Sequence, residues 1–172
     1  LPRTPKTMQE ALAGPDAAHW AKARAKELVG IEERSTWREE TQPKGKRVVT
    51  SKWAFRTSWE ADGSIKYRAR IVARGFSQVP GFDFDKTYAP TLQFKTLMCV
   101  LGMVAHLELE AEATDVGSAY LESKIDKVIF LLLPKDLWGA DGTPKTVLLL
   151  KALYGLKQAG ELWSRLMGTT LS

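Results

Sequence analysis

The sequence is poor in cysteine and lacks a long hydrophobic run. Its one cysteine, Cys99, excludes an internal disulfide and a cysteine-rich metal site, and its apolar neighbours predict a small core residue. The apolar stretch at residues 96–107 is about half as long as a membrane span, and no basic-then-apolar leader opens the sequence. We therefore expect no membrane association and an intracellular location, either in a cytoplasmic particle or in the nucleus.

The composition is that of a chain that can fold. Of the 172 residues, 44% are hydrophobic and 26% are charged, which is enough apolar material to bury a core and excludes compositional disorder. The length fits one ordinary domain or one large piece of a bigger domain.

Positive charge is concentrated in one block of the chain. The formal net charge is +5, and residues 44–74 contain nine cations against only Glu60 and Asp62. The nine are Lys44, Lys46, Arg47, Lys52, Arg56, Lys66, Arg68, Arg70 and Arg74. The positive charge of this block is larger than the net positive charge of the whole chain, so the block is the part of the sequence that indicates a polyanionic partner.

Most of these cations fall on two alternating segments that flank Asp62-Gly63-Ser64, a sequence typical of a β-hairpin turn. Because side chains alternate along a strand, residues 47–59 and 65–74 each present one apolar and one cationic face. The cationic face holds Lys52, Arg56, Lys66, Arg68, Arg70 and Arg74. It is either an ordinary solvated surface or a phosphate-contacting ribbon, and the lack of acidic residues on that face favours the ribbon.

The other segments predict a mixed α and β fold. Helical spacing occurs at residues 8–13, 17–31, 92–108 and 159–167, and residues 128–133 and 147–150 read as short strands. Residues 75–90 are irregular, and residues 109–114 lead into Asp115.

Residues 115–122, Asp-Val-Gly-Ser-Ala-Tyr-Leu-Glu, suggest a nucleotide site. A carboxylate after a strand can hold Mg²⁺, and small residues let backbone N–H groups approach a triphosphate. An aromatic side chain can form the floor of the sugar pocket. Taken alone the pattern is weak, since an aspartate at a strand end is more often a turn or cap residue, and Tyr120 could be plain core.

Several blocks together resemble the reverse transcriptase domain of copia-type LTR retrotransposons, in that family's order and spacing, over about residues 8–170. They are Trp20 with Glu27-Leu28, Ser35-Thr36-Trp37, residues 51–55 (SKWAF), residues 62–78 (DGSIKYRARIVARGFSQ), residues 81–84 (GFDF), residues 87–90 (TYAP), Asp115-Val116 with Ala119-Tyr120-Leu121, and residues 153–158 (LYGLKQ) with Trp163.

The resemblance implies an α+β fold that is part of a right-hand polymerase, with a fingers β-hairpin and an incomplete palm whose sheet carries Asp115. Residues 1–6 would be a tail, 7–42 a helical segment, 43–90 the fingers-like hairpin and loop, and 91–172 the partial palm. We also expect an unpaired sheet edge and exposed apolar surface around residues 128–133.

The resemblance also assigns residues to roles. Asp115 matches the first catalytic, metal-binding aspartate, and Mg²⁺ is the implied cofactor. The positions that match nucleotide contacts are Arg68, Arg70, Arg74, Ser118, Ala119, Tyr120, Tyr154, Gly155, Lys157 and Gln158. Template or primer contacts would come from Lys52, Arg56 and Lys66; Lys157 could equally be a solvated surface lysine.

The sequence departs from the family pattern at three places. Gly160-Glu161 stands where Pro-Arg is usual, Met98 stands near an expected arginine, and Glu122-Ser123 replaces a usual glycine. Two-metal phosphoryl transfer also needs further carboxylates, which the family supplies from an aromatic-x-Asp-Asp hairpin. The later aspartates here, Asp126, Asp136 and Asp141, are isolated.

The implied function is therefore that of a fragment of a retrotransposon RNA-directed DNA polymerase, acting on template–primer and deoxynucleotide. We expect this chain to be inactive alone, with the rest of the palm, the thumb, RNase H and integrase as missing polyprotein partners. The alternatives are a non-catalytic nucleic-acid-binding or interaction module derived from a transposon, and a gene-model remnant.

Overall fold

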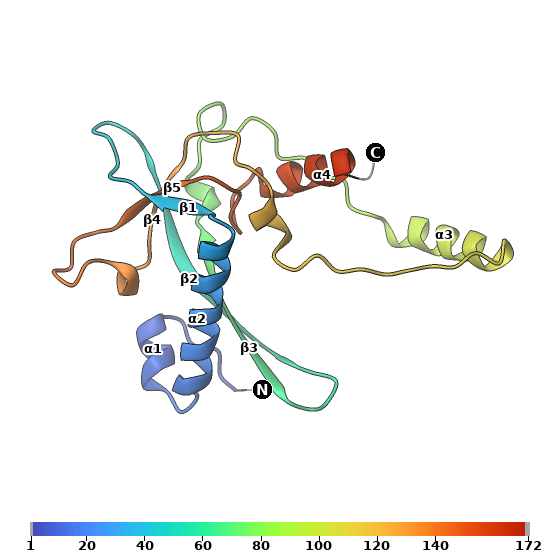
Figure 1. The fold of residues 1–172 in the computed structure, drawn as a ribbon, viewed down its shortest axis with the longest axis horizontal. Coiled ribbons are helices and arrows are strands. Elements are labelled where there is room, and N and C mark those ends of the chain that lie inside the picture. The colour runs from blue at the N-terminus through green and yellow to red at the C-terminus, as the bar shows by residue number, and fades with distance from the viewer. Residues whose placement is uncertain (1, 171–172) are drawn as a thin grey trace.

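The computed structural model describes residues 2–170 as an α+β fold with four α-helices and one five-stranded sheet (Figure 1). The helices are α1 (Met8–Ala13), α2 (Ala17–Glu33), α3 (Phe94–His106) and α4 (Ala159–Thr170). The strands are β1 (Trp37–Glu39), β2 (Val48–Trp59), β3 (Ile65–Ala73), β4 (Phe130–Leu132) and β5 (Thr146–Leu149). Short 3₁₀ turns lie at η1 (Gly75–Ser77), η2 (Ala119–Glu122) and η3 (Lys135–Leu137).

The strand order in the sheet is β1-β5-β4-β2-β3, so it combines strands that are far apart in the chain. β2 and β3 form the predicted antiparallel hairpin, whose turn places Gly63 at φ 78° and bonds the Ser64 N–H to the Asp62 carboxylate at 2.8 Å. β2 pairs with β4 in parallel, and β4–β5 and β5–β1 are antiparallel.

Helix α2 packs against the apolar face of the hairpin. Trp20 is 2% exposed, and its ring lies edge-on to Phe55 at 5.2 Å and to Tyr67 at 4.9 Å between centroids. Edge-to-face aromatic pairs of this kind add specificity to apolar burial. The alternation predicted from the sequence is confirmed, because Val49, Trp53, Ala69 and Ile71 are buried on this one face.

The predicted unpaired edge at residues 128–133 is wrong. β4 is a central strand with a hydrogen-bonded neighbour on each side, and Leu131 in it is fully buried. The edges of the sheet are β1 and β3. The error arose because a short apolar run does not reveal which strands flank it, and the parallel partner of β4 lies more than 70 residues earlier in the chain.

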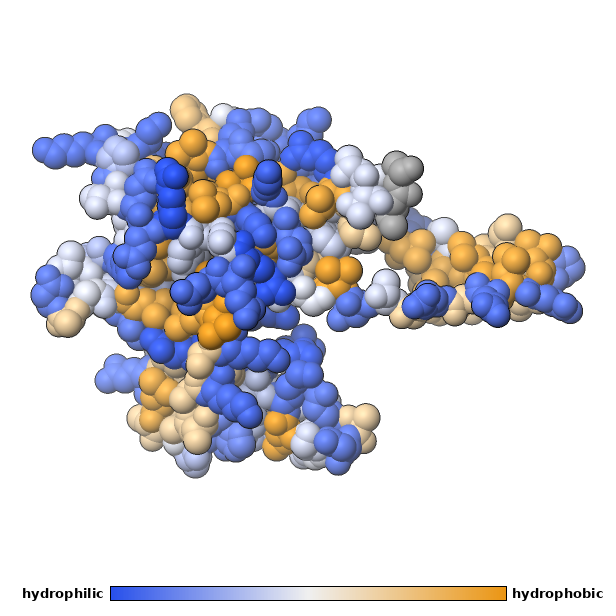
Figure 2. All heavy atoms as spheres, viewed as in Figure 1, coloured by the Kyte–Doolittle hydropathy of each residue, from blue (hydrophilic) through white to orange (hydrophobic). Residues whose placement is uncertain are grey.

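Of the exposed apolar surface predicted at residues 128–133, only Val128 is exposed, at 68%. A larger exposed apolar surface lies on α3, which extends away from the body of the molecule between two long connecting segments (Figures 1 and 2). None of the α3 residues is buried, and Phe94 is 74% exposed. Cys99 lies on this helix and is exposed, so the core position predicted for it is wrong. Among the described residues, no helix is long and apolar enough to cross a bilayer.

The segment that leads to Asp115 is also different from the expectation. Residues 109–116 form neither strand nor helix, so the described sheet does not carry Asp115. Asp115 is exposed on this irregular segment, and η2 begins four residues later. A palm sheet around the aspartate is therefore not present in residues 2–170.

Candidate nucleic-acid interface

The strand register gathers the hairpin cations on one face. Arg56 lies directly opposite Arg68, and Arg70 and Lys66 lie opposite the small residues Ala54 and Ser58. Like charges directly opposite each other in an antiparallel pair are destabilising. This face therefore carries an electrostatic cost that a bound polyanion would remove.

Little of this charge is neutralised within the chain. Lys66 pairs with Glu60 at 3.0 Å, beside the hairpin turn. Arg56, Arg68 and Lys52 form no ion pair with any residue in the range 2–170. The cations remain available to an external anion, as a phosphate-contacting surface requires.

An open cleft of about 1220 Å³ lies beside the hairpin. α2 forms one wall, and β3, the segment from Asp115 to Leu121 and Tyr154 form the rest. Eight of the residues assigned by resemblance line it: Lys66, Arg68, Arg70, Asp115, Ser118, Ala119, Tyr120 and Tyr154. The fold thus brings together four stretches that are widely separated in sequence.

Tyr154 connects the cationic strand to the aromatic of the 115–122 motif. The Arg70 guanidinium carbon lies 4.7 Å from the centroid of the Tyr154 ring, which is a cation–π contact. The Tyr120 ring meets Tyr154 at 5.8 Å between centroids and at 66°. Arg70, Tyr154 and Tyr120 therefore form a continuous row along the cleft, and the Tyr154 hydroxyl is buried without a hydrogen-bond partner in the described chain.

The 115–122 motif turns sharply at Ser118, which adopts the left-handed conformation with φ 59°. The Ser118 carbonyl accepts a hydrogen bond from the Leu121 N–H at 2.8 Å, and this bond begins η2. Leu121 is buried and fixes the turn to the core. Ser118 and Ala119 line the cleft. Contact between their amides and a triphosphate stays a prediction.

The residues present do not make a magnesium site. Within residues 2–170 there is no group of three His, Cys, Asp or Glu side chains placed to hold a metal ion. The Asp136 carboxylate is engaged elsewhere, since it accepts from Arg24 at 3.1 Å and from the Trp53 indole at 2.8 Å. Asp115 is a single exposed carboxylate, so the other oxygens that octahedral Mg²⁺ needs would have to come from water, substrate phosphates or further carboxylates.

Other assigned residues lie outside the cleft and have contacts of their own. Gln158 is fully buried, where its side chain accepts from Gln78 at 3.0 Å and donates to the Asp83 carbonyl at 2.8 Å. Lys157 places its ammonium 5.1 Å from the centroid of the Phe84 ring. Arg74, Gly155, Lys52 and Arg56 also do not line the cleft. Nucleotide or template contact by these residues stays a prediction.

Gly155 holds the end of β3 against the turn that bears Tyr154. Its φ is 85°, and an added Cβ would clash with the Ala73 carbonyl oxygen and lie 2.6 Å from Val72 Cγ1. The Ala73 N–H donates to the Tyr154 carbonyl at 2.8 Å across this contact. Only glycine combines this backbone conformation with so close an approach, so the position of Tyr154 depends on Gly155.

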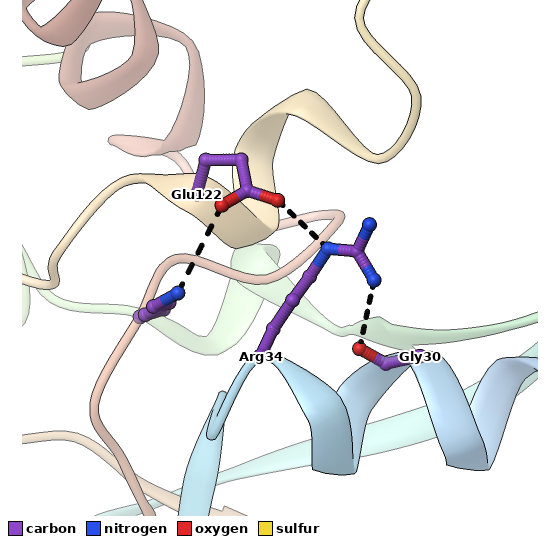
Figure 3. A network of polar contacts seen from close by, with 4 residues as sticks. Gly30, Arg34 and Glu122 are labelled. Atoms are coloured by element: carbon purple, nitrogen blue, oxygen red, sulfur yellow. Dashed lines mark hydrogen bonds and ion pairs between the residues drawn. The ribbon is translucent and has the colours of Figure 1, made fainter.

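A polar network that was not predicted from the sequence connects α2 to η2 (Figure 3). The Arg34 Nε donates to Glu122 at 2.8 Å, and another guanidinium nitrogen donates to the Gly30 carbonyl at 3.1 Å. Lys151 approaches the second Glu122 oxygen at 3.9 Å. Glu122, one of the departures from the family pattern, thus ties the turn after Tyr120 to the end of α2.

Glu27, which the sequence identified only as part of a family block, makes a second contact that was not predicted. Its carboxylate accepts the Ile71 N–H of β3 at 3.1 Å. Burial raises the pKa of Glu27, and this hydrogen bond together with the nearby Arg70 and Arg34 opposes the rise. Arg34 directly follows the last residue of α2 and lies seven residues after Glu27, a spacing of two helical turns that places both on one side of the helix. That spacing is the sequence signal that could have indicated their shared role.

The fold and the cleft define an α+β domain with a cationic hairpin face beside an open cleft. The family described as reverse transcriptase (RNA-dependent DNA polymerase) matches residues 34–172, and this chain belongs to that family. The resemblance to copia-type elements is confirmed by the relatives. The chain is 33% identical over 162 residues to a retrovirus-related Pol polyprotein from transposon TNT 1-94 of Nicotiana tabacum, and 31% identical over 122 residues to one from transposon RE2 of Arabidopsis thaliana.

These alignments cover 94% and 70% of this chain but only 12% and 8% of the two polyproteins, so the chain spans a small part of them. It is also 31% identical over 110 residues to an uncharacterised mitochondrial protein of Arabidopsis thaliana, with 63% of each chain covered. No solved structure matches the chain.

Proposed function

We propose that this chain is the part of an RNA-directed DNA polymerase that holds the phosphates of template–primer and incoming deoxynucleotide. The hairpin face with Arg56 and Arg68 would contact the nucleic-acid backbone. Arg70 and Tyr120 would contact the nucleotide in the cleft. Family membership supports the reaction class, and the unpaired cations of the hairpin support the phosphate-binding role.

The row Arg70, Tyr154 and Tyr120 is the observation that carries the proposal. Arg70 belongs to β3, Tyr154 to the turn that also contains Gly155, and Tyr120 to η2. Each was assigned to nucleotide contact from a separate motif. Their contact in one cleft is what a nucleotide site would require: a cation for phosphate, and an aromatic surface that could pack against a sugar or base.

We limit the proposal to binding. In a complete polymerase, two Mg²⁺ ions would assist attack of the primer 3′-hydroxyl on the α-phosphate, and Asp115 would supply one of their ligands. The residues described here do not complete that site, so we assign no catalytic step to this chain alone. The remaining carboxylates would come from other parts of the polyprotein.

A second function, that of a non-catalytic nucleic-acid-binding module, is favoured by one observation. Asp115 is exposed on an irregular segment, whereas the cationic hairpin is ordered by its register and by α2. A protein that needs only phosphate contacts would keep the hairpin and tolerate a free Asp115. Both functions share the same binding surface. Primer extension by the polyprotein that contains this chain separates them, because only the polymerase function predicts that Asp115→Asn abolishes that extension.

The binding experiment measures the affinity for a fluorescein-labelled primer–template by anisotropy over a series of salt concentrations. Replacing Arg56→Gln and Arg68→Gln together removes two phosphate contacts, so the slope of log K against log salt should become shallower by about 1.4 to 1.8. By the same relation, the affinity at about 0.1 M salt should fall about 25- to 60-fold.

The matched control is Lys86→Gln with Lys95→Gln, because both lysines are exposed, lie away from the cleft and remove the same charge. Its slope should stay within the experimental error of the wild type. If the slope of log K against log salt becomes shallower by the same amount in both double variants, the effect depends only on net charge and not on the hairpin. That result would overturn the proposal.

A further inference from the structure

The cleft follows the open edge of β3. In the strand order β3 is an edge strand, and its outward N–H groups at Ile71 and Ala73 donate to the Glu27 carboxylate and the Tyr154 carbonyl. Because outward donors recur at every second residue, the N–H groups of Tyr67 and Ala69 face the same edge. Both residues line the cleft, and neither N–H has a partner among the described residues.

Helix α2 adds two cations to the opposite wall. Lys22 and Lys26 are one helical turn apart and therefore lie on the same helix face. Both are exposed, both line the cleft, and neither forms an ion pair within residues 2–170. They approach the β3 edge from the side of α2, whereas Arg68 and Arg70 belong to the other face of the hairpin.

The charge balance of the cleft favours an anionic occupant. Six lining residues are cationic and three are acidic. They are Lys22, Lys26, Arg34, Lys66, Arg68 and Arg70, against Glu27, Glu33 and Asp115. Three of these groups already have partners: Glu27 accepts from the Ile71 N–H, and Arg34 and Lys66 pair with Glu122 and Glu60 outside the cleft lining. The groups that remain are Lys22, Lys26, Arg68 and Arg70 against Glu33 and Asp115. An extended polyanion with regularly repeated charge would meet cations along both walls and free N–H donors between them.

We propose that Lys22 and Lys26 bind the phosphates of a single-stranded nucleic acid that lies along the β3 edge, opposite Arg68 and Arg70. This inference rests on the proposed function and extends it from the hairpin to α2. It makes the cleft a two-walled track, with α2 as the second wall, for the unpaired part of a template.

The test uses the full chain and a fluorescein-labelled oligothymidylate as the probe. Lys22→Gln with Lys26→Gln should make the salt slope shallower by about 1.4, because each lost phosphate contact on a single strand contributes about 0.7. The affinity at about 0.1 M salt should then fall about 25-fold by the same relation. Glutamine is a good helix former, so α2 should persist, which far-UV circular dichroism checks.

A second measurement locates the contact without any substitution. Amine acetylation of the wild-type chain, read by mass spectrometry, should be slowed at Lys22 and Lys26 by the oligonucleotide and unchanged at Lys86 and Lys95. The Lys86→Gln and Lys95→Gln variant is the charge-matched control for the slope.

The outcomes separate this inference from the function on which it rests. If Arg56→Gln with Arg68→Gln reduces the slope while the α2 variant and acetylation show nothing, the α2 wall is wrong and the hairpin function stands. If neither variant changes the slope, both are wrong. If a polyglutamate peptide displaces the oligonucleotide at equal charge concentration and protects the same lysines, the cleft is an acidic-peptide site and the inference is overturned.

Discussion

Replacing Gly155 by alanine tests how the cleft is held together. The substitution places a Cβ on a residue with φ 85°, which costs about 1–2 kcal/mol for an L-residue. It also drives that Cβ into the Ala73 carbonyl oxygen and to within 2.6 Å of Val72 Cγ1. Overpacking of this kind costs typically 1–3 kcal/mol, so the free energy of unfolding should fall by about 2–5 kcal/mol.

Gly63→Ala is the matched control. Gly63 has nearly the same φ, 78°, but nothing lies within 4 Å of its added Cβ. It should therefore lose only the conformational part, about 1–2 kcal/mol. Urea denaturation followed by tryptophan fluorescence measures both, since Trp20 and Trp53 are buried in the core and become exposed on unfolding.

The difference between the two alanine variants isolates the close approach of Gly155 to β3. If Gly155→Ala costs no more than Gly63→Ala, the turn that bears Tyr154 is not pressed against Ala73. The row of cleft residues would then lack the support that the structure gives it.

Three further predictions concern single charged side chains. Arg68→Gln removes the like charge opposite Arg56, so it should raise the free energy of unfolding by about 0.2–1 kcal/mol at low salt. Urea denaturation measures this change, and an unchanged or lower free energy of unfolding would contradict the prediction. Burial raises the pKa of Glu27 above its ordinary value, so protonated Glu27 stabilises the fold at low pH and this stabilisation is lost as the pH rises through the folded-state pKa. Glu27→Gln keeps an acceptor for the Ile71 N–H and does not titrate, so its free energy of unfolding should rise relative to that of the wild type between about pH 4 and 8. Glu33→Gln is the control, and a Glu27→Gln difference from the wild type that does not change with pH would refute the prediction. Purified chain with Mg²⁺ should not extend a primer, and extension that Asp115→Asn abolishes would show that the described residues suffice for catalysis.

The hairpin was predictable because its signal is local. Alternation of apolar and cationic residues about Asp62-Gly63-Ser64 sets both the strand faces and the turn, and the burial of Trp53 and Ile71 on the same face follows directly. The parallel pairing of β2 with β4 was not predictable, because it joins residues distant in sequence through backbone groups that leave no pattern in the side chains.

The motifs predicted only some of the residues that line the cleft. They identified Arg70, Tyr120 and Tyr154, which the fold places in contact, whereas Lys157 and Gln158 lie outside the cleft. The roles of Glu27 and Glu122 depend on where α2 packs, which the sequence does not specify. The prediction that Cys99 is buried failed for a different reason. The apolar residues of α3 indicate burial, but none of the described elements covers this helix.

The measurement that tests the central claim most directly is cross-link mapping with an oligonucleotide that carries 5-iodouridine, a photoreactive base that couples to nearby aromatic side chains. Binding in the cleft predicts adducts on Tyr120 or Tyr154, although both are only half-exposed. Phe76 and Phe82, which are 80% and 74% exposed, serve as internal controls for random encounter. Adducts confined to those two residues, with none at Tyr120 or Tyr154, would contradict nucleic-acid binding in this cleft.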